Sequence, residues 1–284
     1  MLITETKAIT DTLHKVVADT TSKAQDTGWI LHHILDGKEL DFSPFSMIPL
    51  PHINLFGMDL SITRHLVFMW IAAVIMIIVL RKVANSYKKS YVPKGLTNAV
   101  ETLILFVRDE IVKPNIGKGY EKFLPYLLTV FFFIFVCNFL GLIPYGATAT
   151  SNISVTATLA LFTFFITQIG GIMKNGLFGY FKGLVPHGIP FWLLPIMAVV
   201  ELLGLFTKPF ALAIRLFANM TAGHIVIYAL LGLIFILHTY FVAPVSVAFA
   251  LFIFFLEILV AVLQAYIFTM LSSLFIGMAV HQEH

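Results

Sequence analysis

Three charged side chains lie at seven-residue intervals inside a long apolar segment of the chain. Glu201, Lys208 and Arg215 fall within residues 189–236, where most residues are Leu, Ile, Val, Phe, Ala or Gly. At 100° per residue, a step of seven drifts only about 20° around a helix, so the three side chains share one helical face. A cation at the centre of a membrane helix costs roughly 2.5–3.5 kcal/mol on insertion scales, which indicates that Arg215 has a function.

Further polar residues accompany Arg215. Asn219 follows it by one helical turn and lies on the same face. Glu257 and Gln264, in the next apolar segment, are again seven residues apart and share a face. His224 comes nine residues after Arg215, about half a turn around the helix, so the two side chains point in different directions. This arrangement favours two polar environments over one binding pocket.

The residue types indicate what chemistry these environments support. Arginine keeps its proton in proteins, so Arg215 cannot relay protons, but it can attract a carboxylate and exclude other cations. Histidine, glutamate and glutamine side chains can pass or orient protons through chains of water. A permanent cation beside such groups predicts two access routes separated by a barrier, as in an ion-translocating membrane subunit. For Lys208 a simpler alternative stays open, in which the side chain only reaches toward the membrane interface.

The composition places the chain in the membrane. It is 59% hydrophobic and 12% charged, with a mean hydropathy of +0.92, whereas a soluble domain is nearer half apolar and a quarter charged. The one cysteine, Cys137, excludes an internal disulfide and a cysteine-built metal site. No nucleotide-binding loop, HExxH or GxSxG motif is present. We therefore expect no enzyme activity, cofactor, metal site or nucleic-acid partner.

The apolar segments predict an all-α polytopic membrane protein with about five membrane-crossing helices. The first three cover residues 66–80, 123–145 and 153–173. The loop 81–94 has five basic residues and no acid, so the positive-inside rule places it in the cytoplasm and the N-terminus outside. The uncharged loop 146–152 then lies outside. We expect an external N-terminal region over residues 1–60 and a single membrane domain over residues 61–284.

A segment between the first two spans has a different pattern. Residues 95–113 predict an amphipathic helix on the cytoplasmic surface of the membrane, ended by Pro114. Its apolar positions recur at helical spacing: Leu96, Ala99, Val100, Leu103, Ile104, Val107 and Ile111.

The last two apolar segments, 189–237 and 243–280, are much longer than the ~20 residues that cross a bilayer core. Each is either one long helix that tilts strongly or bends, or a re-entrant hairpin. Pro190, Pro195 and Pro209 are candidate bend sites. Two long slanted helices side by side would fit around a curved partner.

The stretch KPFALAIRLFANMTAGH, residues 208–224, resembles the signature of subunit a of the F-type ATP synthase. Residues 106–117 and 123–144 resemble the second and third helices of that family, and the pair Glu257 and Gln264 resembles part of its last helix. The resemblance extends from about residue 60 to the C-terminus.

The resemblance implies roles for individual residues. Arg215 matches the family's essential arginine, and four residues match its polar positions: Glu201, Lys208, Asn219 and Gln264. Many members have an acid at the position of His224 and a histidine at the position of Glu257, so the pair is exchanged in this chain. Some members also carry an acid where this chain has Gly141, three residues after Asn138.

The resemblance further implies a stator subunit that provides two offset half-channels for protons beside a rotating ring of c subunits. Arg215 would separate the half-channels and interact with the c-subunit carboxylate. The implied partners are the c-ring, the b subunits of the peripheral stalk, the rest of the ATP synthase and the lipid bilayer. The implied location is the bacterial plasma (inner) membrane, with the N-terminus outside and the C-terminus in the cytoplasm. The alternative function is a secondary transporter that binds an anionic substrate at Arg215.

Overall fold

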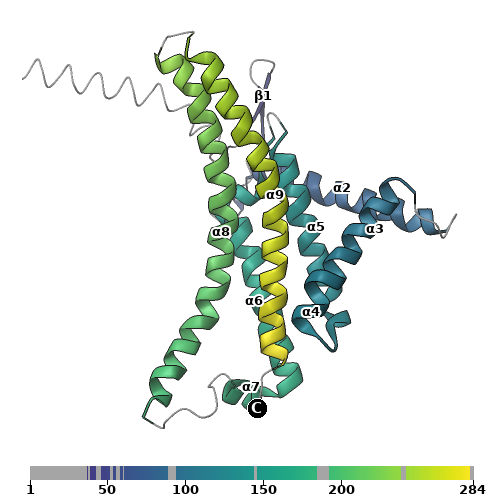
Figure 1. Cartoon of the computed structure of the whole chain (residues 1–284). Helices are drawn as coiled ribbons and strands as arrows, with labels where there is room; N and C mark the ends of the chain where they lie inside the picture. The colour runs from purple at the N-terminus through teal and green to yellow at the C-terminus, as the bar shows by residue number, and fades with distance from the viewer. Residues whose placement is uncertain are drawn as a thin grey trace, which may run out of the picture. The chain divides into compact units, whose positions relative to one another are not determined.

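In the computed structural model of the chain, the described residues are 37, 39–42, 46–51, 54–55, 58–59, 61–88, 94–143, 146–183, 192–237 and 241–281 (Figure 1). The chain divides into two compact units. One contains Lys38–Met220 and Glu257–His284, and the other contains Met1–Gly37 and Thr221–Leu256. Most of the predicted N-terminal region 1–60 lies outside the described residues, and its external location stays a prediction.

The membrane helices follow two short β-hairpins that the sequence patterns did not predict. In the first hairpin, β1 (Glu39–Phe42) pairs antiparallel with β2 (Ser46–Pro49). In the second, β3 (Asn54–Leu55) pairs with β4 (Met58–Asp59). Four and two residues are too few to give a clear alternation of apolar and polar positions, which is the signal that identifies strands.

Five helices are long and apolar enough to cross a membrane, as predicted. They are α2 (Arg64–Tyr87), α5 (Leu124–Gly141), α6 (Ile153–Asn175), α8 (Leu194–Leu237) and α9 (Ala243–Val280). The prediction of an all-α polytopic membrane protein is confirmed. Helix α2 extends through Arg81 and Lys82, although these residues were predicted to lie in a loop. Near a helix end, their long side chains can still reach polar surroundings.

Helices α8 and α9 are single continuous helices, so the re-entrant hairpin is wrong (Figure 1). Pro195 lies in the first turn of α8, where the missing N–H costs nothing. Pro209 lies inside α8 without ending it. The strong tilt stays a prediction. Pro190 and the first residues of the segment 189–237 lie outside the described residues.

The predicted amphipathic segment continues past Pro114. It consists of α3 (Leu96–Phe106), a π-helical turn η1 (Val107–Val112) and α4 (Lys113–Ile116). Pro114 lies in the first turn of α4, where its missing N–H is tolerated. The helix ends instead at Gly117, whose φ of 70° lies in the left-handed region that favours glycine.

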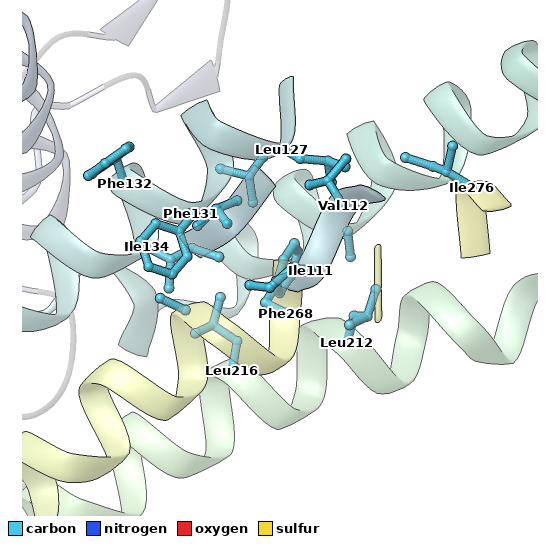
Figure 2. Packing of buried hydrophobic residues seen from close by; sticks show 14 of the residues in the cluster. Ile111, Val112, Leu127, Phe131, Phe132, Ile134, Leu212, Leu216, Phe268 and Ile276 are labelled. Carbon is cyan, nitrogen blue, oxygen red and sulfur yellow. The ribbon is translucent and has the colours of Figure 1, made fainter. Parts of the chain in front are cut away.

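The apolar face of this segment packs against the protein. Val107 and Ile111 are fully buried, and Val100 is almost so. They join one cluster with Leu127 of α5, Leu216 of α8 and Phe268 of α9, part of which Figure 2 shows. The helical spacing was therefore predicted correctly, but most of the face lies in the protein core, because α5 and α9 offer an apolar surface to cover it. A location at the membrane surface stays a prediction.

The remaining elements are short. They are η2 (Tyr120–Lys122), η3 (Ala149–Ser151) and α7 (Leu177–Gly183). Helix α7 packs closely on α6, because Gly171 lets the Tyr180 ring approach: a Cβ at Gly171 would lie 2.5 Å from that ring. A similar contact joins α9 to α4, where a Cβ at Gly277 would lie 2.1 Å from the carbonyl oxygen of Asn115.

Gly277→Ala should destabilise the protein by about 1–3 kcal/mol, because the atom that the new methyl group meets belongs to the backbone and cannot rotate away. The matched control is Gly204→Ala in α8, where the nearest atom is the end of the Glu201 side chain at 3.9 Å. Thermal unfolding of the purified complex measures both. Equal midpoints for Gly277→Ala and Gly204→Ala would contradict the proposed tight contact.

Candidate functional site

Arg215 lies on the exposed side of α8. The adjoining side of the helix is held in the core by Leu212, Leu216 and Met220, which are 2%, 0% and 0% exposed. Among the residues that the structure describes, Arg215 makes no hydrogen bond or ion pair. The packing of α8 therefore presents a permanent cation outward, on a helix that is long and apolar enough to cross a membrane.

The side of α8 that faces away from this core is apolar. Leu203, Phe206, Phe210 and Ile214 follow one another at helical spacing and are 58%, 61%, 68% and 38% exposed. A charge in such surroundings is stable only when it faces a cavity or an oppositely charged partner. Arg215 therefore needs either a water-filled cavity or an anionic partner at this position.

Glu201 and Lys208 line a cavity of about 370 Å³ among α6, α7, α8 and α9. The cavity also contains polar side chains of α6 and α7, and Tyr180 donates a hydrogen bond to Gln168 over 2.8 Å. The ammonium group of Lys208 lies 5.7 Å from the centre of the Phe275 ring. The predicted common face of Glu201 and Lys208 agrees with their shared cavity, whereas Arg215 is not among the cavity's lining residues.

Asn219, Gln264 and Glu257 form a second polar region. The Asn219 amide donates to Gln264 Oε1 over 2.9 Å and thereby joins α8 to α9. Glu257 and Gln264 are 4% and 2% exposed, so both lie on the buried face of α9, as their spacing predicted. This region lies on the C-terminal side of Arg215 along α8, whereas Glu201 and Lys208 lie on its N-terminal side.

His224 belongs to the unit that contains Thr221–Leu256, where it is half-buried. Glu257 belongs to the other unit. The functional pairing of His224 with Glu257 therefore stays a prediction. His238, which could mark the end of the span, lies outside the described residues.

A chain of buried polar groups near the predicted outer loop was missed by the sequence analysis. Asn138 of α5 donates to the carbonyl of Ala261 over 3.1 Å and accepts a hydrogen bond of 2.6 Å from Thr150. His65 Nε2 lies 3.1 Å from Ser151 Oγ, whose hydroxyl donates to the carbonyl of Thr148 over 2.8 Å. Because that hydroxyl hydrogen is already used, His65 is the donor in the contact with Ser151.

One signal in the sequence could have revealed this chain. The loop 146–152, GATATSN, contains many hydroxyl groups and no charge. A loop of this kind between two apolar helices must satisfy its polar groups internally, either with its own hydroxyls or with polar side chains of neighbouring helices. Ala147, Thr148, Ala149 and Thr150 are indeed buried.

The same loop explains Gly141. A Cβ at Gly141 would lie 1.7 Å from Thr148 Oγ1 and 2.6 Å from Thr148 Cβ. A side chain of any size would therefore displace the loop. The absence of an acid at this position agrees with the close packing of Thr148 on α5.

Comparisons with known proteins place the chain in a family. The family model described as ATP synthase A chain matches residues 66–277. ATP synthase subunit a of Chloroherpeton thalassium is 59% identical over 259 residues, which cover 89% of this chain and 77% of that protein. ATP synthase subunit a 2 of Chlorobaculum tepidum is 56% identical over 88% of this chain and 72% of its own length. Subunit a of Myxococcus xanthus is 56% identical over 80% of this chain and 75% of its own length.

The family match covers all five membrane-spanning helices in full or nearly so, and the whole of the polar set from Glu201 to Gln264. The comparisons agree with the resemblance that was noted around Arg215 and not with the alternative of a secondary transporter. The chain, a multi-pass membrane protein, belongs to the ATP synthase A chain family.

Proposed function

We propose that the chain is the stator subunit a of an F-type ATP synthase and provides two offset half-channels for protons against the rotating c-ring. The observation that carries the proposal is the position of Arg215 between two polar regions. Lys208 precedes it by about 10 Å along α8 and Asn219 follows it by about 6 Å. The exposed cation thus separates the cavity of Glu201 and Lys208 from the region of Asn219 and Gln264.

The cytoplasmic half-channel uses the cavity that Glu201 and Lys208 line. Its position near the N-terminal end of α8 supports this side, because the preceding segment has basic residues and the positive-inside rule places it in the cytoplasm. The hydroxyl and amide groups of Tyr180 and Gln168 make part of its wall polar. Water can enter a cavity of this volume when it has such partners.

The outer half-channel is lined by Asn219, Gln264, Glu257 and His224. The burial of Glu257 and Gln264 supports a path inside the protein rather than along the lipid. The contact of Asn138 with the carbonyl of Ala261, four residues after Glu257, supports a polar connection from the loop 146–152 to α9.

Protons then move by the following steps. A carboxyl group of a c subunit is neutral in lipid, because burial disfavours its charged form. At the interface, the nearby guanidinium of Arg215 favours the ionised form, so the proton leaves through the cytoplasmic half-channel. The outer half-channel supplies the next proton. Each charge that crosses 100 mV releases about 2.3 kcal/mol, so several protons are needed for each ATP.

In this role the chain is a non-catalytic subunit. It assembles with the c-ring, the b subunits of the peripheral stalk and the rest of the ATP synthase in the bacterial plasma membrane. The N-terminus lies outside and the C-terminus in the cytoplasm. The length of α8 and α9 supports helices that tilt strongly along the ring.

Arg215→Ala should abolish proton-driven ATP synthesis and ATP-driven proton pumping without preventing assembly, because Leu212, Leu216 and Met220 still hold α8 in place. Arg215→Lys should fail as well, since an ammonium group lacks the planar fork and can lose its proton when buried. Arg81→Ala, at the exposed end of α2, is the control for loss of one cation. Both activities are measured in membrane vesicles with verified subunit content. Normal coupled synthesis in Arg215→Ala would contradict the proposal.

The orientation can be tested with single cysteines in a Cys137→Ala background. Lys88 and Ser154 are both exposed and lie at opposite predicted sides of the membrane. Lys88 belongs to the segment 81–94, and Ser154 follows the loop 146–152. A membrane-impermeant maleimide should label Lys88→Cys only in inside-out vesicles and Ser154→Cys only in right-side-out vesicles. The reverse pattern would overturn the predicted topology.

The pair His224 and Glu257 can be tested by restoring the arrangement of many family members, with an acid at position 224 and a histidine at position 257. Glu257→Leu should slow proton flux by on the order of a hundredfold, as expected for the loss of a proton-transferring group. His224→Glu alone should also be harmful, because it brings two acids into one half-channel. Adding Glu257→His should restore part of the flux. If the double variant conducts no better than the worse single variant, His224 and Glu257 do not act as a pair.

A further inference from the structure

A groove with basic and apolar walls lies where α5 begins and α6 ends. Its volume is about 420 Å³. Three lysines line it: Lys118, Lys122 and Lys174. The rest of the lining is mostly apolar: Gly119, Phe123, Tyr126, Ile166, Ile169, Gly170, Met173 and Val280. None of the residues described above as part of the proton path lines this groove.

The chain topology gathers the three lysines at one end of two helices. Tyr126 of α5 bonds Thr163 of α6 over 2.8 Å, and Phe123 lies against Gly170. Lower numbers on α5 thus face higher numbers on α6, so the helices are antiparallel. The start of α5 and the end of α6 therefore lie side by side, and each is flanked by lysine.

The charge at this end is positive. Lys118, Lys122 and Lys174 are all exposed, and no carboxylate is among the groove's lining residues. Glu121 lies in the same turn and carries a negative charge. The three lysines and Glu121 together therefore have a net charge of +2. The N-terminal end of helix α5 also lies here, and its helix dipole adds to the positive potential.

The apolar part of the groove runs along α6 away from the lysines. Ile169 and Met173 are 54% and 79% exposed. From Ile166 to Lys174 the wall extends about 12 Å along the helix. Phe123 forms part of the other wall and packs against Gly170, where a Cβ would lie 2.9 Å from the ring.

We propose that this groove binds one anionic phospholipid, with its phosphate among the three lysines and an acyl chain along Ile166, Ile169 and Met173. The proposal rests on the fit of charge and shape at the end of two membrane helices, where basic pockets select anionic headgroups. A soluble phosphate would use the lysines but leave the apolar wall exposed. The headgroup of a choline lipid carries a quaternary ammonium as well as a phosphate. The three lysines would repel this ammonium. The inference is independent of the proposed proton path.

The test uses the assembled ATP synthase in nanodiscs of phosphatidylcholine with a small fraction of phosphatidylglycerol that carries a photoreactive acyl chain. After illumination, mass spectrometry locates the label. We expect labelling of residues 166–173, reduced by added phosphatidylglycerol and unchanged by phosphatidylcholine or inorganic phosphate. Equal labelling by a photoreactive phosphatidylcholine, or competition by inorganic phosphate, would overturn the proposal.

Variants separate the headgroup from the acyl chain. The triple variant Lys118→Gln, Lys122→Gln, Lys174→Gln should lose about fivefold in labelling for each lysine removed, roughly a hundredfold in all. The matched control replaces three exposed cations at the junction of α2 and α3, Arg81, Lys82 and Lys94, by glutamine and should label normally. Ile169→Trp, which keeps the charge but fills the groove, should also lose labelling.

Three further outcomes would contradict the proposal. The first is an unchanged label in the triple lysine variant. The second is an equal loss in the control variant, which would indicate attraction by net charge alone. The third is a crosslink from a photoreactive group at position 169 to another protein subunit, which would identify the groove as a protein interface.

Discussion

The guanidinium of Arg215 sets the constraint to which the other features of the site respond. It keeps its charge, lies on an apolar helix surface, and has no partner among the described residues. Leaving it in lipid is unfavourable, so the side chain needs a water-filled cavity or an anionic partner. The proposed partner is a carboxylate that must lose its proton when it arrives.

The packing of α8 and α9 turns this requirement into a defined position. Leu212, Leu216 and Met220 fix the rotation of α8, which sets the direction of Arg215. The amide contact between Asn219 and Gln264 ties α8 to α9 one turn beyond the arginine. On the other side of α9, Gly277 allows backbone contact with α4. The part of α9 from Glu257 onward is thus held from two directions.

Part of this structure was predictable from the sequence and part was not. Runs of apolar residues revealed the five membrane helices, because the bilayer leaves few alternatives to a helix. Seven-residue spacing predicted that Glu201 and Lys208 share a face, as do Glu257 and Gln264, but not that the first pair lines a cavity or that the second is buried. The same pattern could not distinguish a face buried in lipid from one buried in protein, as for Val107 and Ile111. The hydrogen bond between Thr150 and Asn138 depends on the folded path of a loop, which spacing does not encode.

The loop 146–152 shows how a neighbouring element can determine the residue at a polar position. Thr148 packs so closely on Gly141 that no side chain fits there, which rules out the acid that some family members carry at this position. Thr150 instead satisfies Asn138, and Asn138 in turn reaches the backbone of α9 at Ala261. Hydroxyl and amide groups can orient water but carry no charge of their own. His65 is the titratable side chain that contacts this loop, at Ser151. Glu257 and His224 supply the titratable groups of the proposed outer half-channel on α9 and α8, so the exchanged acid and imidazole should be sensitive to substitution.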